Sequence, residues 1–313
     1  MKPSISVIVP VYNTSSYLEK SIQSLINQSF KSFELIVIND GSTDNSLEIC
    51  KKFAEKDSRI VLISQENKGI GSVRKIGMEK AIGDYIIHVD SDDYVENNFL
   101  EELFNQIHVT NADICLCDFN RFSSQTTEYC SQEIDLKSDT IINGILTETI
   151  FGGLWNKMVK RDLIQQNNLS INSNLKMYED LNLVIEMLTK TEKISYVNKA
   201  LYNYRTNEQS ITHQRNPETI ISAFITVENL SSVLDSEKHK NSLNEFKLGV
   251  KRDVLLYGNF NKAKNLYPET DIHIKQSTLL TKFQKIVLLL LANKQENLSY
   301  AILKLRKKFK SIF

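Results

Sequence analysis

Three aspartates within four residues are the part of this sequence best suited to chemistry. Asp90, Asp92 and Asp93 follow Asp84–Val89, an apolar run that predicts a buried strand. Carboxylates this close repel one another, and a divalent cation among them removes that cost. An EF-hand is excluded, because Val95 stands where that loop requires glycine. The pattern indicates a metal site at a strand end, with an acidic surface loop as the alternative.

A second polar turn, residues 40–44 (DGSTD), follows a strand predicted at Phe33–Asn39. The carboxyl ends of parallel strands share one edge of a sheet, where ligands bind. The chain has no Walker loop and no dinucleotide-binding glycine pattern, and residues 68–71 hold only a weak glycine pair. If the ligand is a nucleoside diphosphate, these acids imply Mg²⁺ or Mn²⁺ between protein and diphosphate.

A third acidic group, Glu179 and Asp180, opens a helix predicted over residues 179–188. Acids in a first helical turn are favoured by the helix dipole, which is a purely structural explanation. A general base that accepts a proton from a reacting group is the functional alternative.

The elements that must position these acids alternate along the first part of the chain. Helical patterns separate five predicted strands, at Ile5–Val11, Phe33–Asn39, Ile60–Ile63, Asp84–Val89 and Ala112–Cys117. This alternation predicts an α/β fold, with helices on both faces of a mostly parallel sheet. Residues 121–134 read as irregular or as a hairpin, and the chain after Thr212 as almost wholly helical. We expect one domain over residues 1–215 and a helical region over 216–313.

Charge is balanced over the whole chain but not along it. Among 313 residues, 38 are Lys or Arg and 38 are Asp or Glu, so the basic excess that nucleic acid requires is missing. Residues 281–313 hold eight basic residues and one acidic residue. Their apolar residues form one helical stripe, Leu298, Ile302, Leu305, Phe309 and Ile312. A basic amphipathic helix predicts contact with an anionic membrane surface, and a helix packed on the body is the alternative.

Seven segments in order resemble the inverting glycosyltransferases of family 2, whose nucleotide-sugar-binding fold is called GT-A. They are SVIVPVYN at 6–13, VINDGSTD at 37–44, 67–74, 83–93, LWNK at 154–157, 179–180 and 202–211. The resemblance covers about residues 4–212. It implies a GT-A domain followed by a helical C-terminal region.

The resemblance implies a donor site at the first two strand ends. Pro10, Tyr12 and Asn13 look like the wall of the nucleotide pocket, with Tyr12 able to stack on the base. Asp40 looks like the acid that contacts the uracil or ribose, and Arg74 matches the family arginine of the donor site.

The resemblance also implies roles around the metal. Asp90 and Asp92, with Ser91 between them, match the DxD motif. Asp92 is similar to the direct metal ligand, and Asp90 to the residue that reaches the ribose or the metal. Arg205 and Ser210 resemble late residues that steady the diphosphate.

At the acceptor side, Asp180 looks like the general base, and Trp155, Lys157 and Glu179 are acceptor candidates. Trp155 reads equally well as a core residue. Asn39 replaces an Asp that many members have, which leaves the finer nucleotide contacts open. The QxxRW motif of processive synthases is absent, which favours transfer of one sugar per binding event.

The sequence therefore predicts a non-processive inverting glycosyltransferase that is assisted by Mn²⁺ or Mg²⁺. The predicted donor is a UDP-sugar, and the predicted acceptor is a hydroxyl of a lipid-linked or surface-polysaccharide glycan. Three alternatives remain: an inactive scaffold for another transferase, a sugar-nucleotide pyrophosphorylase, and a membrane-surface interaction protein. A pyrophosphorylase would need a Gly-rich, Arg-containing loop where residues 10–13 stand.

No signal peptide is recognised, and the longest apolar run, Ile286–Ala292, is far short of the ~20 residues of a membrane span. The cysteines show no disulfide or zinc spacing, which fits a reducing compartment. We expect a cytoplasmic protein that is peripheral on the inner face of the bacterial cell membrane, and a homo-oligomer is an open alternative for its assembly.

Overall fold

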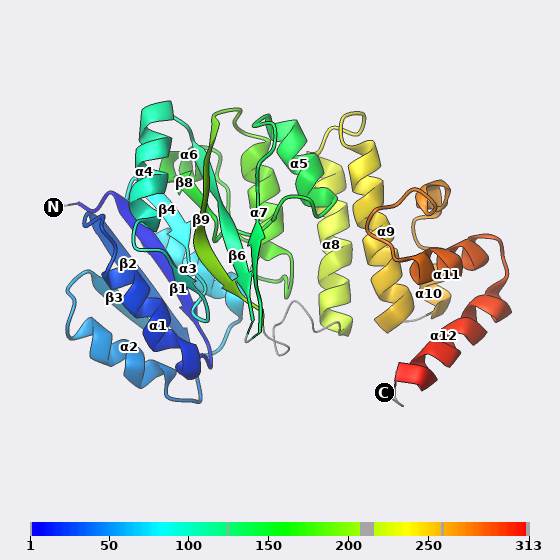
Figure 1. Ribbon diagram of the computed structural model, residues 1–313, viewed down its shortest axis with the longest axis horizontal. Coiled ribbons are helices and arrows are strands. Elements are labelled where there is room, and N and C mark those ends of the chain that lie inside the picture. The colour runs from blue at the N-terminus through cyan, green and yellow to red at the C-terminus, as the bar shows by residue number, and fades with distance from the viewer. Residues whose placement is uncertain (1, 124, 207–215, 258–259, 311–313) are drawn as a thin grey trace. The chain divides into compact units, whose positions relative to one another are not determined.

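The computed structural model describes residues 2–123, 125–206, 216–257 and 260–310, with side chains as far as Lys304. The chain divides into two compact units, one of Met1–Ile141 with Phe151–Ser210 and one of Ile142–Ile150 with Ile211–Phe313. The domain boundary expected near residue 215 falls within 207–215, outside the described residues. Figure 1 labels helices and strands of both units.

The first unit is built on a nine-stranded sheet, of which four strands form a parallel half. Their order is β3-β2-β1-β4. They are β1 (Ile5–Val11), β2 (Phe33–Asp40), β3 (Ile60–Gln65) and β4 (Tyr85–His88). Every residue of β1 and β2 is buried, as expected for parallel strands covered on both faces.

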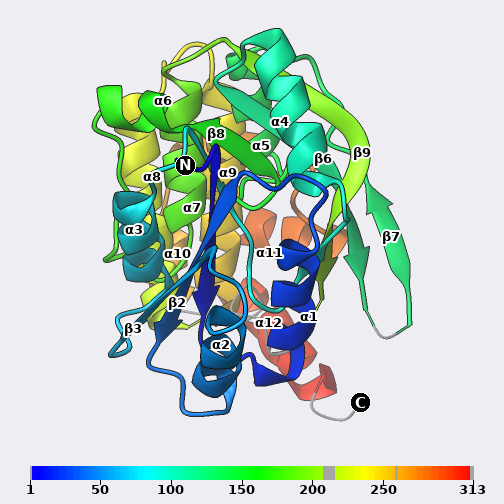
Figure 2. The same ribbon diagram turned by 90° about the vertical axis from the view of Figure 1, so that its left-hand side faces the viewer.

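Helices cover both faces of this parallel half (Figure 2). The connecting helices are α1 (Ser15–Ile26), α2 (Ser46–Ala54) and α3 (Ile70–Lys80). Val7 and Val9 of β1 share a core cluster with the apolar side of α1, whereas Ile8 lies against Gly77 of α3. Successive side chains of a strand point to opposite faces, so α1 and α3 lie on opposite sides of the sheet.

The rest of the sheet is mixed. Five further strands complete it, β5 (Tyr94–Val95), β6 (Ile114–Phe122), β7 (Thr127–Cys130), β8 (Lys157–Lys160) and β9 (Ile194–Arg205). β8 runs antiparallel to β4 and β6, β5 runs antiparallel to β9, and β6 and β9 are parallel. The α/β prediction is confirmed, but the sheet is mostly parallel only over its first four strands. Strands of two and four residues are too short to show an apolar period, so the sequence did not reveal β5 and β8.

Residues 121–134 contain the hairpin that the sequence allowed, formed by β6 and β7 (Thr127–Cys130). Strand β9 extends over twelve residues to Arg205 because it pairs along the whole of β6, with a register shift around Asp118. The helices of this half are α4 (Phe99–Thr110), α5 (Ser138–Leu146), which crosses the boundary between the units, α6 (Arg161–Gln166) and α7 (Glu179–Leu188).

The second unit is helical in its described part. Its helices are α8 (Pro217–Val233), α9 (Lys240–Tyr257), α10 (Phe260–Lys264), the 3₁₀ helix η2 (Pro268–His273), α11 (Lys282–Ala292) and α12 (Glu296–Lys310). Capping boxes begin α8 and α11. Leu298 on the predicted stripe is exposed and Ile302 is half-buried, and the side chains of Leu305, Phe309 and Ile312 lie outside the described part. Among the described residues, no helix has both the length and the apolar character to span a membrane.

Candidate active site

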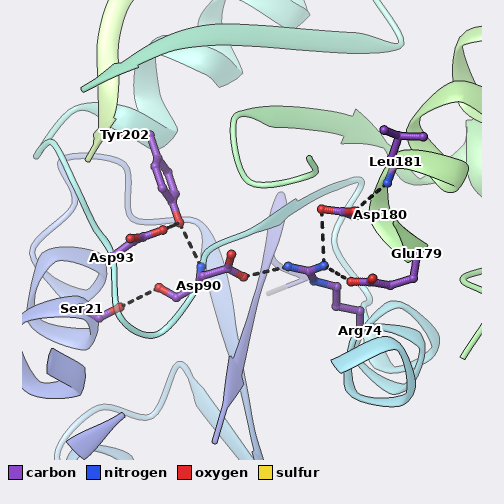
Figure 3. Close-up of polar contacts among 8 residues, drawn as sticks. All are labelled: Ser21, Arg74, Asp90, Asp93, Glu179, Asp180, Leu181 and Tyr202. Atoms are coloured by element: carbon purple, nitrogen blue, oxygen red, sulfur yellow. Dashed lines mark hydrogen bonds and ion pairs between the residues drawn. The ribbon is translucent and has the colours of Figure 1, made fainter. Parts of the chain in front are cut away.

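One buried arginine brings together acids from distant parts of the chain (Figure 3). Arg74 projects from α3, and its Nη2 lies 2.9 Å from Oδ1 of Asp90, in the loop after β4. Its Nη1 lies 2.5 Å from Oε1 of Glu179 and 3.7 Å from Oδ2 of Asp180, at the start of α7. The guanidinium is planar with five N–H donors, so it can serve several carboxylates at once. Two acidic groups that the sequence placed separately therefore share one partner.

Three carboxylates against one guanidinium leave an excess of negative charge. Burial disfavours the charged form of Arg74, but Asp90, Glu179 and Asp180 outweigh it and raise the pKa of the arginine. Burial, reinforced by the Asp180 carboxylate, raises the pKa of Glu179 to about 7. Glu179 thus holds its proton more readily than an exposed glutamate. Asp180 is less enclosed, with 23% of its side chain exposed, so it is the acid of the α7 pair that solvent can reach.

The helix that carries the acidic pair begins with a strained residue. Tyr178, directly before Glu179, has a left-handed backbone with φ of 68°. A bulky side chain in this region costs about 1–3 kcal/mol, and such strain clusters at functional sites. Asp180 Oδ1 accepts a hydrogen bond of 2.7 Å from the backbone N–H of Leu181, which fixes one side of the carboxylate.

The aspartate loop after β4 is anchored by a residue whose role the sequence did not reveal. The buried Asp93 accepts hydrogen bonds from the Tyr202 hydroxyl and from the backbone N–H of Arg205, both at 2.7 Å. The Tyr202 oxygen also accepts a hydrogen bond of 3.1 Å from the backbone N–H of Asp90. Burial, followed by the charges of Asp92 and Asp90, raises the pKa of Asp93 well above its usual value. Asp93 therefore joins β9 to the loop.

Asp92 differs from Asp90 and Asp93 in the donor to its carboxylate, which is the residue's own backbone N–H. Within the described residues, no other residue donates a hydrogen bond to it. Burial, with the Asp90 charge, raises the pKa of Asp92 to about 6. Arg205 lies beside it: its Nε donates to the Asp92 backbone carbonyl at 2.9 Å, and its guanidinium lies over the Tyr17 ring.

These groups suit a divalent cation whose remaining coordination positions are taken by substrate oxygens. Asp92 offers a carboxylate to which no other described residue donates a hydrogen bond, and Asp90 pairs one carboxylate oxygen with Arg74, which leaves its other oxygen for a metal. No group of three His, Cys, Asp or Glu side chains in the described part of the chain could hold a metal by itself. Mg²⁺ is commonly bound by one or two carboxylates together with substrate phosphates, so the donor set suits that mode.

Asp40 is buried and fastens the loop that leads into α3. Its carboxylate accepts hydrogen bonds from the backbone N–H groups of Lys68 (2.9 Å) and Gly69 (2.8 Å). The adjoining Gly41 has a φ of +67°, and a Cβ there would lie 2.7 Å from the backbone nitrogen of Asn67. Only glycine fits this turn without strain. The acid predicted to contact the nucleoside thus also holds the start of the helix that bears Arg74.

The other predicted donor residues lie at the end of β1. Pro10 is buried in the strand, and the Tyr12 side chain is 49% exposed, so its ring is open to a ligand. Asn13 has a φ of 51°, and its Oδ1 accepts a hydrogen bond of 2.8 Å from the backbone N–H of Thr43. The loops after β1 and β2 are therefore joined at this point.

Another hydrogen bond joins the loop after β1 to the aspartate loop. Ser91 Oγ accepts a hydrogen bond of 3.0 Å from Thr14 Oγ1. The carboxyl ends of β1, β2 and β4 therefore meet, as the alternating pattern predicted. Ser210, the last of the predicted donor residues, lies outside the described residues.

The predicted acceptor residues are more enclosed than an acceptor contact requires. Trp155 is 2% exposed and packs in a cluster with the rings of Phe119, Phe151 and Tyr202, at centroid distances of 4.2–4.8 Å. Its ring therefore lies in the core, the alternative left open by the sequence, and has no free face for a sugar. Lys157 is also buried, and all three of its N–H groups are directed at protein oxygens. Glu179 faces Arg74.

Comparison with known proteins agrees with this fold. The sequence profile described as glycosyl transferase family 2 matches residues 6–167. Glycosyltransferase GlyA of Streptococcus pneumoniae is 36% identical over 223 residues, which cover 66% of this chain and 31% of GlyA. This chain therefore spans less than a third of that relative.

Two further matches cover most of both chains. Cholesterol galactosyltransferase of Borreliella burgdorferi is 32% identical over 281 residues, covering 85% of this chain and 72% of that protein. The crystal structure of S. aureus TarS 1–349 with UDP-GlcNAc matches with a TM-score of 0.69 at 20% identity, covering 98% of this chain and 92% of the other. At that identity the structural match establishes the GT-A fold. On the profile and the cholesterol galactosyltransferase match, the chain belongs to glycosyl transferase family 2 and is a glycosyltransferase.

Proposed function

We propose that this protein transfers one sugar at a time from a UDP-sugar to an acceptor hydroxyl, with inversion at the anomeric carbon. The observation that carries the proposal is the bridge formed by Arg74 between Asp90 and the Glu179–Asp180 pair. Through this bridge, the partly exposed carboxylate of Asp180 lies beside the same Arg74 guanidinium that pairs with Asp90 of the DxD loop. A neighbour of the same fold is named as a complex with UDP-GlcNAc, which supports the choice of donor.

In the proposed reaction, Asp180 accepts the proton of the acceptor hydroxyl while its oxygen attacks the anomeric carbon. The bond from that carbon to the diphosphate oxygen breaks, and its electron pair leaves with UDP. Attack from the face opposite UDP inverts the anomeric centre in one displacement. Mg²⁺ or Mn²⁺, when held by Asp92 and Asp90, would supply positive charge to the leaving diphosphate. Arg205 adds a guanidinium beside that loop.

The metal role predicts a specific effect for Asp92→Ala. In isothermal titration, we expect Mn²⁺ to strengthen UDP binding to the wild type, and we expect the variant to bind UDP equally with and without Mn²⁺. The reason is that no other described residue donates a hydrogen bond to the Asp92 carboxylate. Asp84→Ala, with an exposed acid just before β4, is the matched control and should keep the Mn²⁺ effect. An unchanged Mn²⁺ effect in Asp92→Ala would remove Asp92 as the ligand.

A panel of nucleotide sugars tests the donor class. We expect UDP-sugars to raise the melting temperature of the wild type in the presence of Mn²⁺, and to release UDP when an acceptor is supplied. Stabilisation by GDP- or CMP-sugars alone would contradict the proposed donor.

We also propose that the acceptor is a lipid-linked or surface-polysaccharide glycan, reached from the inner membrane face. One relative is named for transfer to cholesterol, which is a lipid. Residues 281–313 carry eight basic residues, and Lys282, Lys294 and Lys304 are exposed. Each basic residue near an anionic surface contributes about 1 kcal/mol to binding.

Replacing Lys304, Lys307 and Lys308 by Gln should therefore weaken binding to phosphatidylserine vesicles by about two orders of magnitude. Vesicle sedimentation measures this, and vesicles of phosphatidylcholine alone should bind neither protein. Equal binding of wild type and triple variant to anionic vesicles would contradict a membrane role for this segment.

A further inference from the structure

The segment Phe151–Gly153 lies directly against the Asp180 carboxylate. A Cβ built on Gly153 would be 3.2 Å from Asp180 Oδ2, so a side chain there would require the carboxylate or the backbone to shift by a few tenths of an ångström. The same Cβ would be 2.2 Å from the Phe151 ring. That ring cannot withdraw cheaply, because it packs against Trp155 at a centroid distance of 4.2 Å. The segment is therefore a wall beside the proposed base.

A buried lysine holds the carbonyl side of this wall. Lys157 Nζ donates to the backbone oxygens of Phe151 at 2.6 Å and Gly153 at 2.9 Å, and to Asn156 Oδ1 at 2.7 Å. Asn156 is in turn fixed to β6, since its Nδ2 donates to the backbone oxygen of Cys117 at 3.0 Å. These bonds tie the wall to the central sheet.

The burial of this lysine needs an explanation beyond packing. Lys157 is 2% exposed, and burying an ammonium is costly unless its hydrogen bonds are satisfied. Burial lowers the pKa of Lys157 to about 7, while the nearby Asp180 charge opposes the decrease. An apolar side chain would fill the same core volume at a lower cost, so the three hydrogen bonds are the feature that distinguishes lysine here.

A second buried group holds the amide side of the wall. The Phe151 N–H donates to Gln132 Oε1 at 2.7 Å. The Gln132 backbone N–H donates in turn at 2.5 Å to Asp118, a fully buried carboxylate on β6 that also accepts a hydrogen bond from the Tyr196 hydroxyl. The wall is thus attached to β6 on both its carbonyl side and its amide side, through two separate sets of buried polar contacts.

We propose that Lys157 and Gln132 are positioning residues, which hold Phe151–Gly153 as the wall that orients the Asp180 carboxylate toward the acceptor hydroxyl. The inference rests on the proposed role of Asp180 and adds the residues that fix its geometry. It replaces the direct acceptor contact that the sequence suggested for Lys157. A displacement of a reacting group by about 1 Å can lower a rate ~10²-fold, so an intact wall matters even though neither residue touches the substrate.

The experiment uses Lys157→Met and Gln132→Leu, which remove the two anchors separately. We expect amide hydrogen exchange of residues 151–155 to quicken at least tenfold in both variants, and kcat for UDP release to fall ~10–10²-fold. The affinity for UDP with Mn²⁺ should stay within about twofold of wild type, because the DxD loop is untouched. Lys160→Met is the matched control: this residue lies on the same strand, with its Nζ 3.8 Å from Asp113, and should change none of these readouts.

Unchanged exchange of residues 151–155 would overturn the proposal, as would a loss of kcat that is matched by an equal loss of UDP affinity. Should either anchor variant fail to fold, Gly153→Ala tests the wall with both anchors intact. Its added Cβ meets Phe151 and Asp180, so kcat should fall while UDP affinity is kept. Failure of the wild type to release UDP from any nucleotide sugar would contradict the proposed function. The comparison of amide hydrogen exchange in residues 151–155 tests the two anchors separately, because it does not depend on turnover.

Discussion

Asp180→Asn is expected to lower the rate of sugar transfer by ~10²–10⁴-fold while UDP binding is retained. Asparagine has the shape of aspartate but cannot accept the acceptor proton. It can still accept the Leu181 N–H and face Arg74, which lies 3.7 Å from Oδ2 in the wild type. The change therefore removes the base and its negative charge but keeps the hydrogen bond that orients the side chain. UDP release measures kcat, and isothermal titration with UDP and Mn²⁺ measures donor binding.

Asp162→Asn is the matched control for this substitution, because Asp162 also lies in the first turn of a helix, α6. It should leave both kcat and UDP affinity unchanged. Near-normal turnover by Asp180→Asn would refute Asp180 as the base. A loss of UDP binding in step with kcat would mean that the residue supports the site rather than the proton transfer.

Arg74→Met is expected to lower the free energy of unfolding by about 3–5 kcal/mol, the usual result when one partner of a buried ion pair is removed. Methionine fills much of the same volume but leaves Asp90, Glu179 and Asp180 without their shared cation. Urea unfolding followed by circular dichroism measures the change. Arg121→Met is the control: its ion pair with Glu128 is exposed, and such pairs contribute at most about 1 kcal/mol.

Glu179→Gln in the Arg74→Met background should recover part of the lost stability, because the amide needs no counter-charge.

The carboxyl group of Glu179 also makes the free energy of unfolding depend on pH. The folded-state pKa of Glu179 is about 7, above its ordinary value of 4.5, so the folded protein holds a proton that the unfolded chain releases within that window. The free energy of unfolding therefore falls as pH rises from about 4.5 to 7. Glu179→Gln should flatten that fall in the wild-type background, and identical slopes for the two proteins would contradict the assignment.

The parallel half of the sheet was predictable because its strands are long apolar runs that end in polar turns. Asp40, Asp90 and Asp92 followed directly, since the carboxyl ends of such strands meet at one edge. The family resemblance then supplied roles that spacing alone leaves open, such as a base at Asp180. These inferences need only local patterns and the order of the motifs.

The partners of these acids could not be predicted, because they are distant in the sequence. Arg74 and Glu179 are 105 residues apart, and Asp93 and Tyr202 are 109 apart. No local pattern predicts that one arginine will form ion pairs with acids from two elements, or that the Asp93 carboxylate will be hydrogen-bonded to β9. Lys157 is a related case: the family resemblance made it an acceptor candidate, whereas in the interior its ammonium donates to three oxygens of the chain's own backbone and side chains.

A short rigid segment, residues 68–74, separates the backbone that Asp40 binds from the Arg74 side chain. Asp40 clamps the backbone of Lys68 and Gly69, α3 begins at Ile70, and Arg74 follows four residues later. Each helical residue turns the chain by about 100°, since a turn takes 3.6 residues, so inserting or deleting one residue there would aim the guanidinium away from both acidic groups. Attempts to redesign sugar preference should keep the length of residues 66–74 fixed and vary side chains elsewhere.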